Sequence, residues 1–147
     1  MAAPELLGFQ SIAGGWWMVV TALIGPDYHE LHQSSRDPEI LEKLRSILTQ
    51  RHGKNLVHGD IRDTNITVQE TSEDIMLIDF DWAGKIGEVR YPMNVFRGDG
   101  LWRSDGACDG ELITTEHDTR RLVFLVGKLF YYFNNGPVLC RPWIRAT

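Results

Sequence analysis

The side chains best suited to chemistry gather between His58 and Asp81. Carboxylates and amides are hard oxygen ligands of the kind that magnesium prefers, and a histidine beside them can hold or transfer a proton. Phosphoryl transfer needs such a set, with a carboxylate near the acceptor hydroxyl and oxygen ligands for magnesium beside a triphosphate. The segment supplies these residues in the order His58, Asp60, Arg62, Asn65, Asp79 and Asp81.

A metal-dependent hydrolase is a second interpretation of the same residue types. Histidine and carboxylate side chains suit a site with two metal ions. Its ligands would be drawn from His58, Asp60, Asp79, Asp81, His117 and Asp118. This interpretation gives no role to the spacing of Asn65, so it ranks below phosphoryl transfer.

The spacing resembles that of a known superfamily. The run from Val57 to Asn65 reads VHGDIRDTN, and Leu77-Ile78-Asp79-Phe80-Asp81 follows across an expected hairpin. Together they resemble the H-x-D-x-x-x-x-N catalytic loop and the metal-binding motif of protein kinases and their small-molecule relatives. The stretches DWAGK at 81–85 and VRYP at 89–92 look most like the kinase-like domains widespread in fungi. The resemblance extends, with decreasing specificity, from about Leu6 to Phe133.

The resemblance implies an ATP- and Mg²⁺-dependent phosphotransferase that acts on a hydroxyl acceptor. Asp60 would orient or deprotonate the acceptor hydroxyl, and Arg62 would lie beside the transferring phosphate. Asn65 and Asp79 would hold Mg²⁺ and, with it, ATP. The acceptor itself, a protein or a small molecule, is left open.

Two further residues have alternative roles. His58 is structural in the family and hydrogen-bonds backbone near the metal motif, whereas its chemistry alone would also allow a general base. Asp118 matches a buried family aspartate that accepts backbone N–H groups of the catalytic loop. Its alternative is a solvated capping residue that pairs with Thr115.

The N-terminal third contains one expected strand. Trp16 to Thr21 is rich in aromatic and β-branched residues without polar alternation, which predicts a buried strand. By resemblance this is the last small-lobe strand, and the backbone of Ala22 and Leu23 would form a hinge that binds the adenine edge of ATP. The polar segment 27–35 favours a short helical turn.

Two helices and a hairpin are expected after it. Asp37 caps a helix over 38–50 that ends before Gly53 in a left-handed cap, and a broadly apolar, buried helix covers 122–133. Apolar runs at 66–68 and 75–80 predict a hairpin. The segment 82–110 lacks periodicity and is expected to be an irregular surface stretch.

These elements indicate an α+β fold: a mainly helical kinase-like large lobe, a short β-hairpin carrying the metal motif, and one or two remnant small-lobe strands. The expected division is 1–25 for the end of the small lobe and the hinge, 26–133 for the large-lobe core and 134–147 for an irregular tail.

The sequence departs from the family at several points. Gly59 stands where many regulated protein kinases have an arginine, which removes the partner for a phosphorylated activation loop; glycine there is also familiar from aminoglycoside and choline kinases. Asp81 replaces the usual glycine of the metal motif, and it is expected to be a second-shell or solvated group, with direct metal binding as the alternative. No Gly-rich loop or strand lysine precedes Trp16. The expectation is therefore an incomplete or degenerate kinase site, with a pseudokinase interaction module as the alternative.

Composition excludes several classes of protein. The net charge of -5, with scattered Lys and Arg, gives no footprint for nucleic acid. The longest apolar stretch has nine residues, against the roughly twenty that a membrane-spanning helix needs. With no secretory signal and two cysteines without CxxC spacing, we expect a soluble cytoplasmic or nuclear protein with free thiols. A truncated core would expose apolar surface for a partner chain to cover.

Overall fold

The computed structural model describes residues 3–31, 38–96 and 101–135 of the 147-residue chain. Short strands alternate with two long helices and one 3₁₀ turn, η1 (Asp63–Asn65). The helices are α1 (Pro38–Gly53) and α2 (Thr115–Asn135). The strands are β1 (Leu6–Ile12), β2 (Trp16–Thr21), β3 (Tyr28–Glu30), β4 (Leu56–Val57), β5 (Ile66–Gln69), β6 (Ile75–Leu77) and β7 (Gly84–Lys85).

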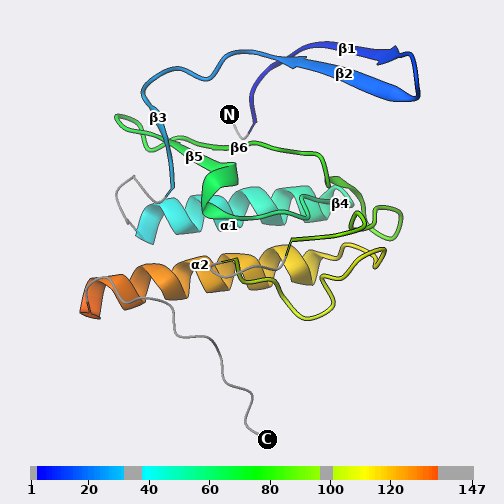
Figure 1. The fold of residues 1–147 in the computed structure, drawn as a ribbon. Coiled ribbons are helices and arrows are strands. Elements are labelled where there is room, and N and C mark those ends of the chain that lie inside the picture. Colours follow the sequence, from blue (N-terminus) through cyan, green and yellow to red (C-terminus); the bar gives the residue numbers. More distant parts are fainter. Residues whose placement is uncertain (1–2, 32–37, 97–100, 136–147) are drawn as a thin grey trace, which may run out of the picture.

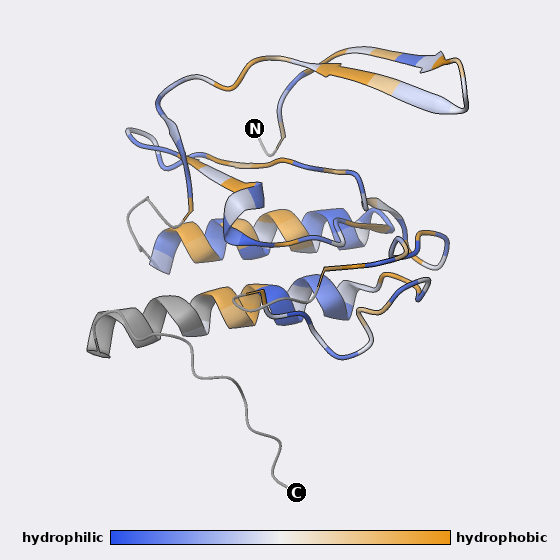
Figure 2. Cartoon of the chain, viewed as in Figure 1, coloured by the Kyte–Doolittle hydropathy of each residue, from blue (hydrophilic) through white to orange (hydrophobic). Residues whose placement is uncertain are grey.

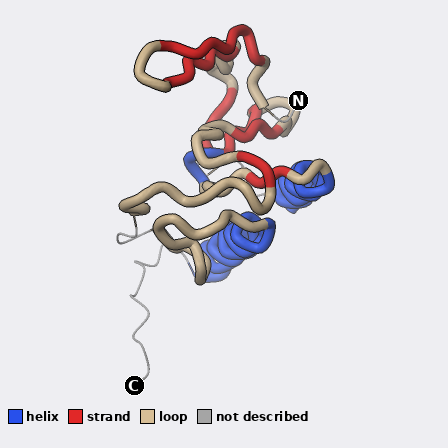
Figure 3. Tube along the Cα trace, turned by 90° about the vertical axis from the view of Figure 1, so that its right-hand side faces the viewer, coloured by secondary structure: helices blue, strands red, loops and turns tan. Residues whose placement is uncertain are grey.

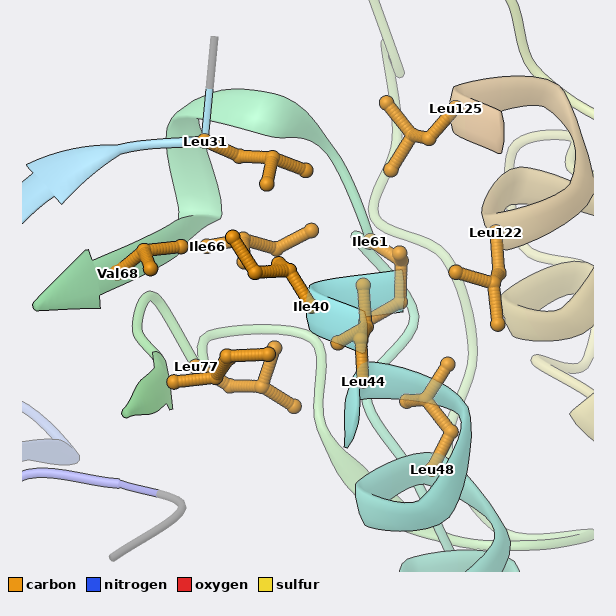
Figure 4. Close-up of a cluster of buried hydrophobic side chains, with 11 residues drawn as sticks. Leu31, Ile40, Leu44, Leu48, Ile61, Ile66, Val68, Leu77, Leu122 and Leu125 are labelled. Carbon is orange, nitrogen blue, oxygen red and sulfur yellow. The ribbon is translucent and has the colours of Figure 1, made fainter. Parts of the chain in front are cut away.

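The main core lies where a small sheet meets the helices. Figure 1 shows α1 between the antiparallel sheet β3-β5-β6 and helix α2. Apolar side chains from all three layers meet in one buried cluster (Figure 4). Its members are Leu31, Ile40, Leu44, Leu48, Ile61, Ile66, Val68, Ile75, Leu77, Leu122 and Leu125. The loop that follows β4 thus rests on packed side chains, because Ile61 from that loop belongs to the cluster.

Helix α1 forms as its sequence predicts. Ile40, Leu44 and Leu48 recur at intervals of four, so they share one face, and all three are buried. The helix runs through Gly53, slightly beyond the expected 38–50. The left-handed residue after it is Asn55, with φ 62°, and not Gly53, so the expected cap position is wrong by two residues. The expected N-cap, Asp37, lies outside the described residues.

The predicted hairpin is present as β5 and β6, which pair Ile66 with Leu77 and Val68 with Ile75. An additional strand extends it, because β3 pairs antiparallel with β5 where a helical turn was expected. The amide of Leu31 continues this pairing by donating to the carbonyl of Ile66 at 2.9 Å. The prediction of a helical turn is wrong because the backbone hydrogen bonds of β3 come from β5, a strand distant in the sequence. No local pattern reveals such a partner.

The segment between β7 and α2 is irregular, as expected, but part of it is buried. A second core cluster unites Val57, Tyr91, Val95, Ala107 and Ile113. The ring of Tyr91 meets that of Trp82 edge to face, with centroids 5.6 Å apart. An entirely superficial loop is therefore the wrong description: the backbone is aperiodic while its apolar side chains pack inward.

The first two strands form a separate hairpin that projects away from both helices (Figures 1 and 3). Every residue from Leu6 to Thr21 except Gly8 is exposed, and hydrophobic residues colour much of both strands in Figure 2. The prediction of a strand at 16–21 is confirmed, whereas its burial is wrong. No described element covers either face of this hairpin.

The mixed α and β composition is confirmed. The expectation of a mainly helical lobe is not confirmed. Helix α1 has 16 residues and helix α2 has 21, and the rest of the described chain consists of short strands, one 3₁₀ turn and irregular segments. Over the described residues, neither helix has the length and apolar character of a membrane span. Of the expected irregular tail, residues 136–147 lie outside the description, and Asn135 still belongs to α2.

Candidate functional site

The loop that joins β4 to η1 is anchored by Asp118, from the first turn of α2. One carboxylate oxygen, Oδ2, accepts the amide N–H of His58 at 2.9 Å, and the other, Oδ1, accepts that of Gly59 at 2.9 Å. His52 Nε2 lies 3.1 Å from Oδ2. Asp118 is 1% exposed. It therefore holds the loop, and the alternative of a solvated cap is wrong.

His58 has a structural position. Its Nε2 lies 3.1 Å from the carbonyl oxygen of Ile78, and its Nδ1 accepts the amide of Asp60 at 3.3 Å. One nitrogen donates and the other accepts, which fits the neutral ring. Burial also lowers the pKa of His58, against the opposing effect of Asp118. Since both nitrogens already have backbone partners, these contacts favour the structural role over a general base.

Gly59 is required by the backbone and by its neighbours. Its φ is +83°, a region that L side chains rarely adopt. A Cβ at this position would lie 2.9 Å from Ile113 Cδ1 and 3.1 Å from the carbonyl oxygen of Trp82. The glycine therefore does more than omit an arginine, because an added Cβ would have to displace Ile113 and would press against the Trp82 carbonyl.

The carboxylate of Asp60 is surrounded by donors. Its Oδ2 accepts Asn65 Nδ2 at 3.1 Å and lies 3.1 Å from Arg62 Nε, an ion pair that lacks hydrogen-bond geometry. Its Oδ1 accepts Arg103 Nη1 at 3.1 Å. Asn65 also donates to the backbone carbonyl of Asp60 at 3.0 Å. These contacts fix the orientation of the carboxyl group. Asp60 is buried, with 6% of the residue exposed.

Arg103 is a site residue that the sequence did not reveal. Its side chain is 8% exposed and lies over the ring of Trp82, with Cζ 4.7 Å from the centroid. Nε also donates to the carbonyl of Phe96 at 3.0 Å. Arg103 comes from the irregular segment before α2, where no periodicity or motif marks it, so no sequence signal could have identified it.

Asp79 has an unusual backbone conformation. Its φ is +61°, which is uncommon outside glycine and costs about 1–3 kcal/mol where the surroundings impose it. Its side chain is 38% exposed and pairs with Arg62, whose Nη2 lies 3.5 Å from Oδ2. The amide of Ile78 donates to the carbonyl of Asn65 at 3.0 Å. This backbone bond keeps the end of β6 beside η1.

Arg121 anchors the loop at a second point. Its Nε donates to the carbonyl of Ile61 at 2.8 Å, and its Nη1 donates to the carbonyl of Trp102. Burial lowers the pKa of Arg121 to about 10. The sequence offered a signal here that was missed: Arg121 follows Asp118 by three residues and so lies on the same face of the helix.

The structure does not link Ala22 and Leu23 to these residues by any contact among the described side chains. Leu23 is 97% exposed, and the amide of Ala22 donates to the carbonyl of Glu5 at 2.8 Å. Asp81 is also exposed. The adenine-binding hinge at Ala22 and Leu23 and the role of Asp81 stay predictions.

The two-metal alternative is not supported by the arrangement. Within the described ranges, no group of three or more His, Cys, Asp or Glu side chains is placed to hold a metal ion. His58 and Asp118 bind backbone groups instead, and His117 Nδ1 accepts the amide of Thr114 at 3.3 Å. Asn65 and Asp79 offer fewer ligands, which suits magnesium because that ion keeps waters and phosphate oxygens in its coordination sphere.

Comparison with known proteins gives a fold but no close relative. No protein-family model matches the chain, and no curated protein matches its sequence. The solved structure of PK-1, the kinase of Cydia pomonella granulovirus, is similar with a TM-score of 0.63 and 14% identity over 86% of this chain. The chain spans 48% of that kinase. This neighbour is viral, so the narrower likeness to fungal domains stays a prediction; what the similarity establishes is a protein-kinase-like fold.

Proposed function

We propose that this chain carries the acceptor-positioning and metal-binding part of a kinase-type phosphotransferase site. The substrates are ATP with Mg²⁺ and a hydroxyl group on a protein or a small molecule. The observation that carries the proposal is the position of Arg62. Its guanidinium lies 3.1 Å from Asp60 Oδ2 and 3.5 Å from Asp79 Oδ2, so one cation joins the carboxylates proposed for acceptor and metal.

Asp60 positions the acceptor hydroxyl. Asn65, Arg62 and Arg103 hold its carboxylate in one orientation, and a fixed carboxylate within reach of a hydroxyl can orient it and accept its proton. Arg62 is 30% exposed and can also meet a phosphate oxygen, because guanidinium groups bind phosphate through several N–H donors.

Asn65 and Asp79 hold the metal. Asp79 presents an exposed carboxylate whose backbone is held in a strained conformation, as is common for residues at functional sites. Magnesium, when bound, neutralises negative charge on the phosphate groups. The amide of Ala22 is already used by Glu5, so an adenine contact at the proposed hinge falls to Leu23 N–H or to a carbonyl oxygen.

An interaction module without catalysis is the second candidate. The exposed apolar hairpin β1–β2 favours it, because surfaces of that kind mark binding sites. The retained set of Asp60, Asn65 and Asp79 favours the phosphotransferase. The two candidates differ in one property that can be measured, namely magnesium-dependent affinity for ATP.

Calorimetric titration with ATP, with and without magnesium, tests the proposal. The expected result is binding that needs magnesium, is abolished by Asp79→Ala and survives Asp81→Ala. Asp81 is the matched control because it is an exposed aspartate two residues away. A folded protein that binds no ATP, or one whose binding is reduced equally by both substitutions, refutes the proposed metal site and leaves the interaction module.

A further inference from the structure

We infer that Arg62 and the metal ion compete for one carboxylate, so that Arg62 is an internal counter-ion that leaves Asp79 when a divalent cation binds. The inference rests on the proposed function, because it takes Asp79 as a metal ligand, and it adds a form of regulation to that site. Three features of the structure carry it: the position of Arg62, the quality of its contacts, and the small number of charged ligands.

Arg62 lies against the carboxylate that the metal needs. Its Nη2 atom is 3.5 Å from Asp79 Oδ2, on the side chain proposed as the charged metal ligand. A guanidinium that stays there and a divalent cation on the same carboxylate repel each other, because both are positive. Binding through Oδ1 does not avoid this repulsion, since the two oxygens of a carboxylate are bonded to the same carbon. The two cations therefore exclude each other.

The contacts of Arg62 are poor, so it can leave Asp79 at little cost. The distance of 3.5 Å to Asp79 exceeds the roughly 2.7–3.2 Å of ordinary N–H···O hydrogen bonds. Both side chains of this pair are partly exposed, Arg62 by 30% and Asp79 by 38%, so water screens their attraction. The Nε atom of Arg62 is buried but makes no hydrogen bond to any residue that the structure describes.

Asp60 does not depend on Arg62 for its position. Asn65 Nδ2 and Arg103 Nη1 each donate a hydrogen bond to its carboxylate at 3.1 Å. Movement of Arg62 therefore leaves Asp60 paired and oriented. The guanidinium that leaves Asp79 gains freedom to meet a phosphate oxygen, which arginine binds through several N–H donors.

The metal site has little charge to share. Of the two proposed ligands, Asn65 is neutral and Asp79 carries the only negative charge. The affinity of oxygen sites for divalent cations depends on the number of charged ligands. A cation that neutralises Asp79 therefore lowers the metal affinity of the whole site.

Titration of the chain with Mn²⁺ alone, with free Mn²⁺ followed by electron paramagnetic resonance, tests the inference. Mn²⁺ prefers the same oxygen ligands as Mg²⁺. Arg62→Gln should lower the dissociation constant by about threefold or more, because it removes the competing cation. Asp79→Asn should abolish binding with or without Arg62. The matched control is Arg120→Gln, which removes the same charge from a 48% exposed side chain and should change nothing.

A second background separates competition at Asp79 from a new ligand. Arg62→Gln also frees Asp60 Oδ2, which lies 3.1 Å from Arg62 Nε and could itself attract the metal. Competition predicts that the gain in affinity persists in the Asp60→Asn background. A gain that disappears there overturns the inference, because the freed Asp60 carboxylate then explains it.

The remaining outcomes distinguish the inference from the proposed function. If Arg62→Gln leaves Mn²⁺ binding unchanged or weakens it, while Asp79→Asn still abolishes it, the metal site stands and the competition is refuted. An equal gain with Arg120→Gln also refutes it, since net charge alone would be responsible. Binding that is absent in both wild type and Arg62→Gln, or that survives Asp79→Asn, refutes the metal site as well. Circular dichroism of each variant verifies that the fold persists.

Discussion

The carboxylate of Asp118 accepts the amide of His58 at 2.9 Å across 60 residues of sequence. With the second oxygen on the amide of Gly59, it satisfies two donors at the point where the loop between β4 and η1 begins. Both partners are buried, so water cannot replace either hydrogen bond. This contact makes the loop dependent on a helix that is distant in the sequence.

We expect Asp118→Ala to lower the free energy of unfolding by about 3–5 kcal/mol, because it leaves two buried amides and the nearby His52 without their acceptor. Glu116→Ala is the control in the same helical turn, since Glu116 is 65% exposed and pairs only with surface Arg120 among the described contacts. It should cost at most about 0.5 kcal/mol. Urea unfolding measures both. Similar losses for the two variants would contradict the anchoring role.

Gly59→Ala tests the close packing around the loop. Gly59 and Gly87 have the same φ of +83°, but only Gly59 has neighbours that an added Cβ would meet. Gly87→Ala should cost about 1 kcal/mol from backbone strain alone. Gly59→Ala should cost about 3 kcal/mol or more, because steric overlap adds to the same strain.

The overlap can be relieved in part. Ile113→Val removes the Cδ1 atom that lies 2.9 Å from the added Cβ, so it should be less destabilising in the Gly59→Ala background than alone. Equal costs at Gly59 and Gly87, measured by chemical denaturation, would show that backbone strain alone explains the glycine.

Arg103 and Asp60 should be strongly coupled. A double-mutant cycle of Arg103→Ala with Asp60→Asn is expected to give an interaction energy of about 1–3 kcal/mol, because both side chains are less than a tenth exposed. The exposed pair Arg120–Glu116 is shorter, at 2.6 Å against 3.1 Å, yet should couple by less than about 0.5 kcal/mol. If the shorter pair were the stronger, burial would not be what gives the Arg103 contact its strength.

Stability should fall on mild acidification. Burial lowers the pKa of His58 and of His117 below the ordinary value of 6.5. Below that pH the unfolded chain takes up protons that the folded chain does not, so the free energy of unfolding decreases as pH falls. From pH 7.5 to 5.5 the slope should steepen, with about 1.4 kcal/mol per pH unit as the upper limit for each histidine.

His117→Gln separates the two histidines. It should reduce the slope without abolishing it, since His58 remains in place. The measurement is the free energy of unfolding by urea at several pH values. A flat profile, or a slope that the substitution leaves unchanged, would contradict a folded state in which both rings are neutral.

Local patterns predicted the elements whose signals lie in short stretches of sequence. Helix α1 followed from apolar residues at intervals of four, and the β5–β6 hairpin from two apolar runs around a polar turn. The motif spacing also grouped Asp60, Asn65 and Asp79 with Arg62, and the structure brings these side chains together, while their roles stay predictions.

Contacts between distant segments could not be predicted in this way. Strand β3 depends on a partner about 40 residues later, and Arg103 reaches Asp60 from an aperiodic segment. Burial was wrong for β2 because an apolar strand carries the same sequence signal whether or not something covers it. A local sequence pattern indicates the secondary structure that a segment favours, whereas its pairing and burial depend on contacts with the rest of the chain.

Asp118 and Arg121 lie three residues apart on α2 and hold the loop at His58, Gly59 and Ile61. We therefore expect the loop and the first turns of this helix to open together as one unit. Amide hydrogens of His58 and Gly59 should then exchange with deuterium as slowly as those inside the helix. The loop thus takes its rigidity from a segment of the chain that has no part in the proposed chemistry.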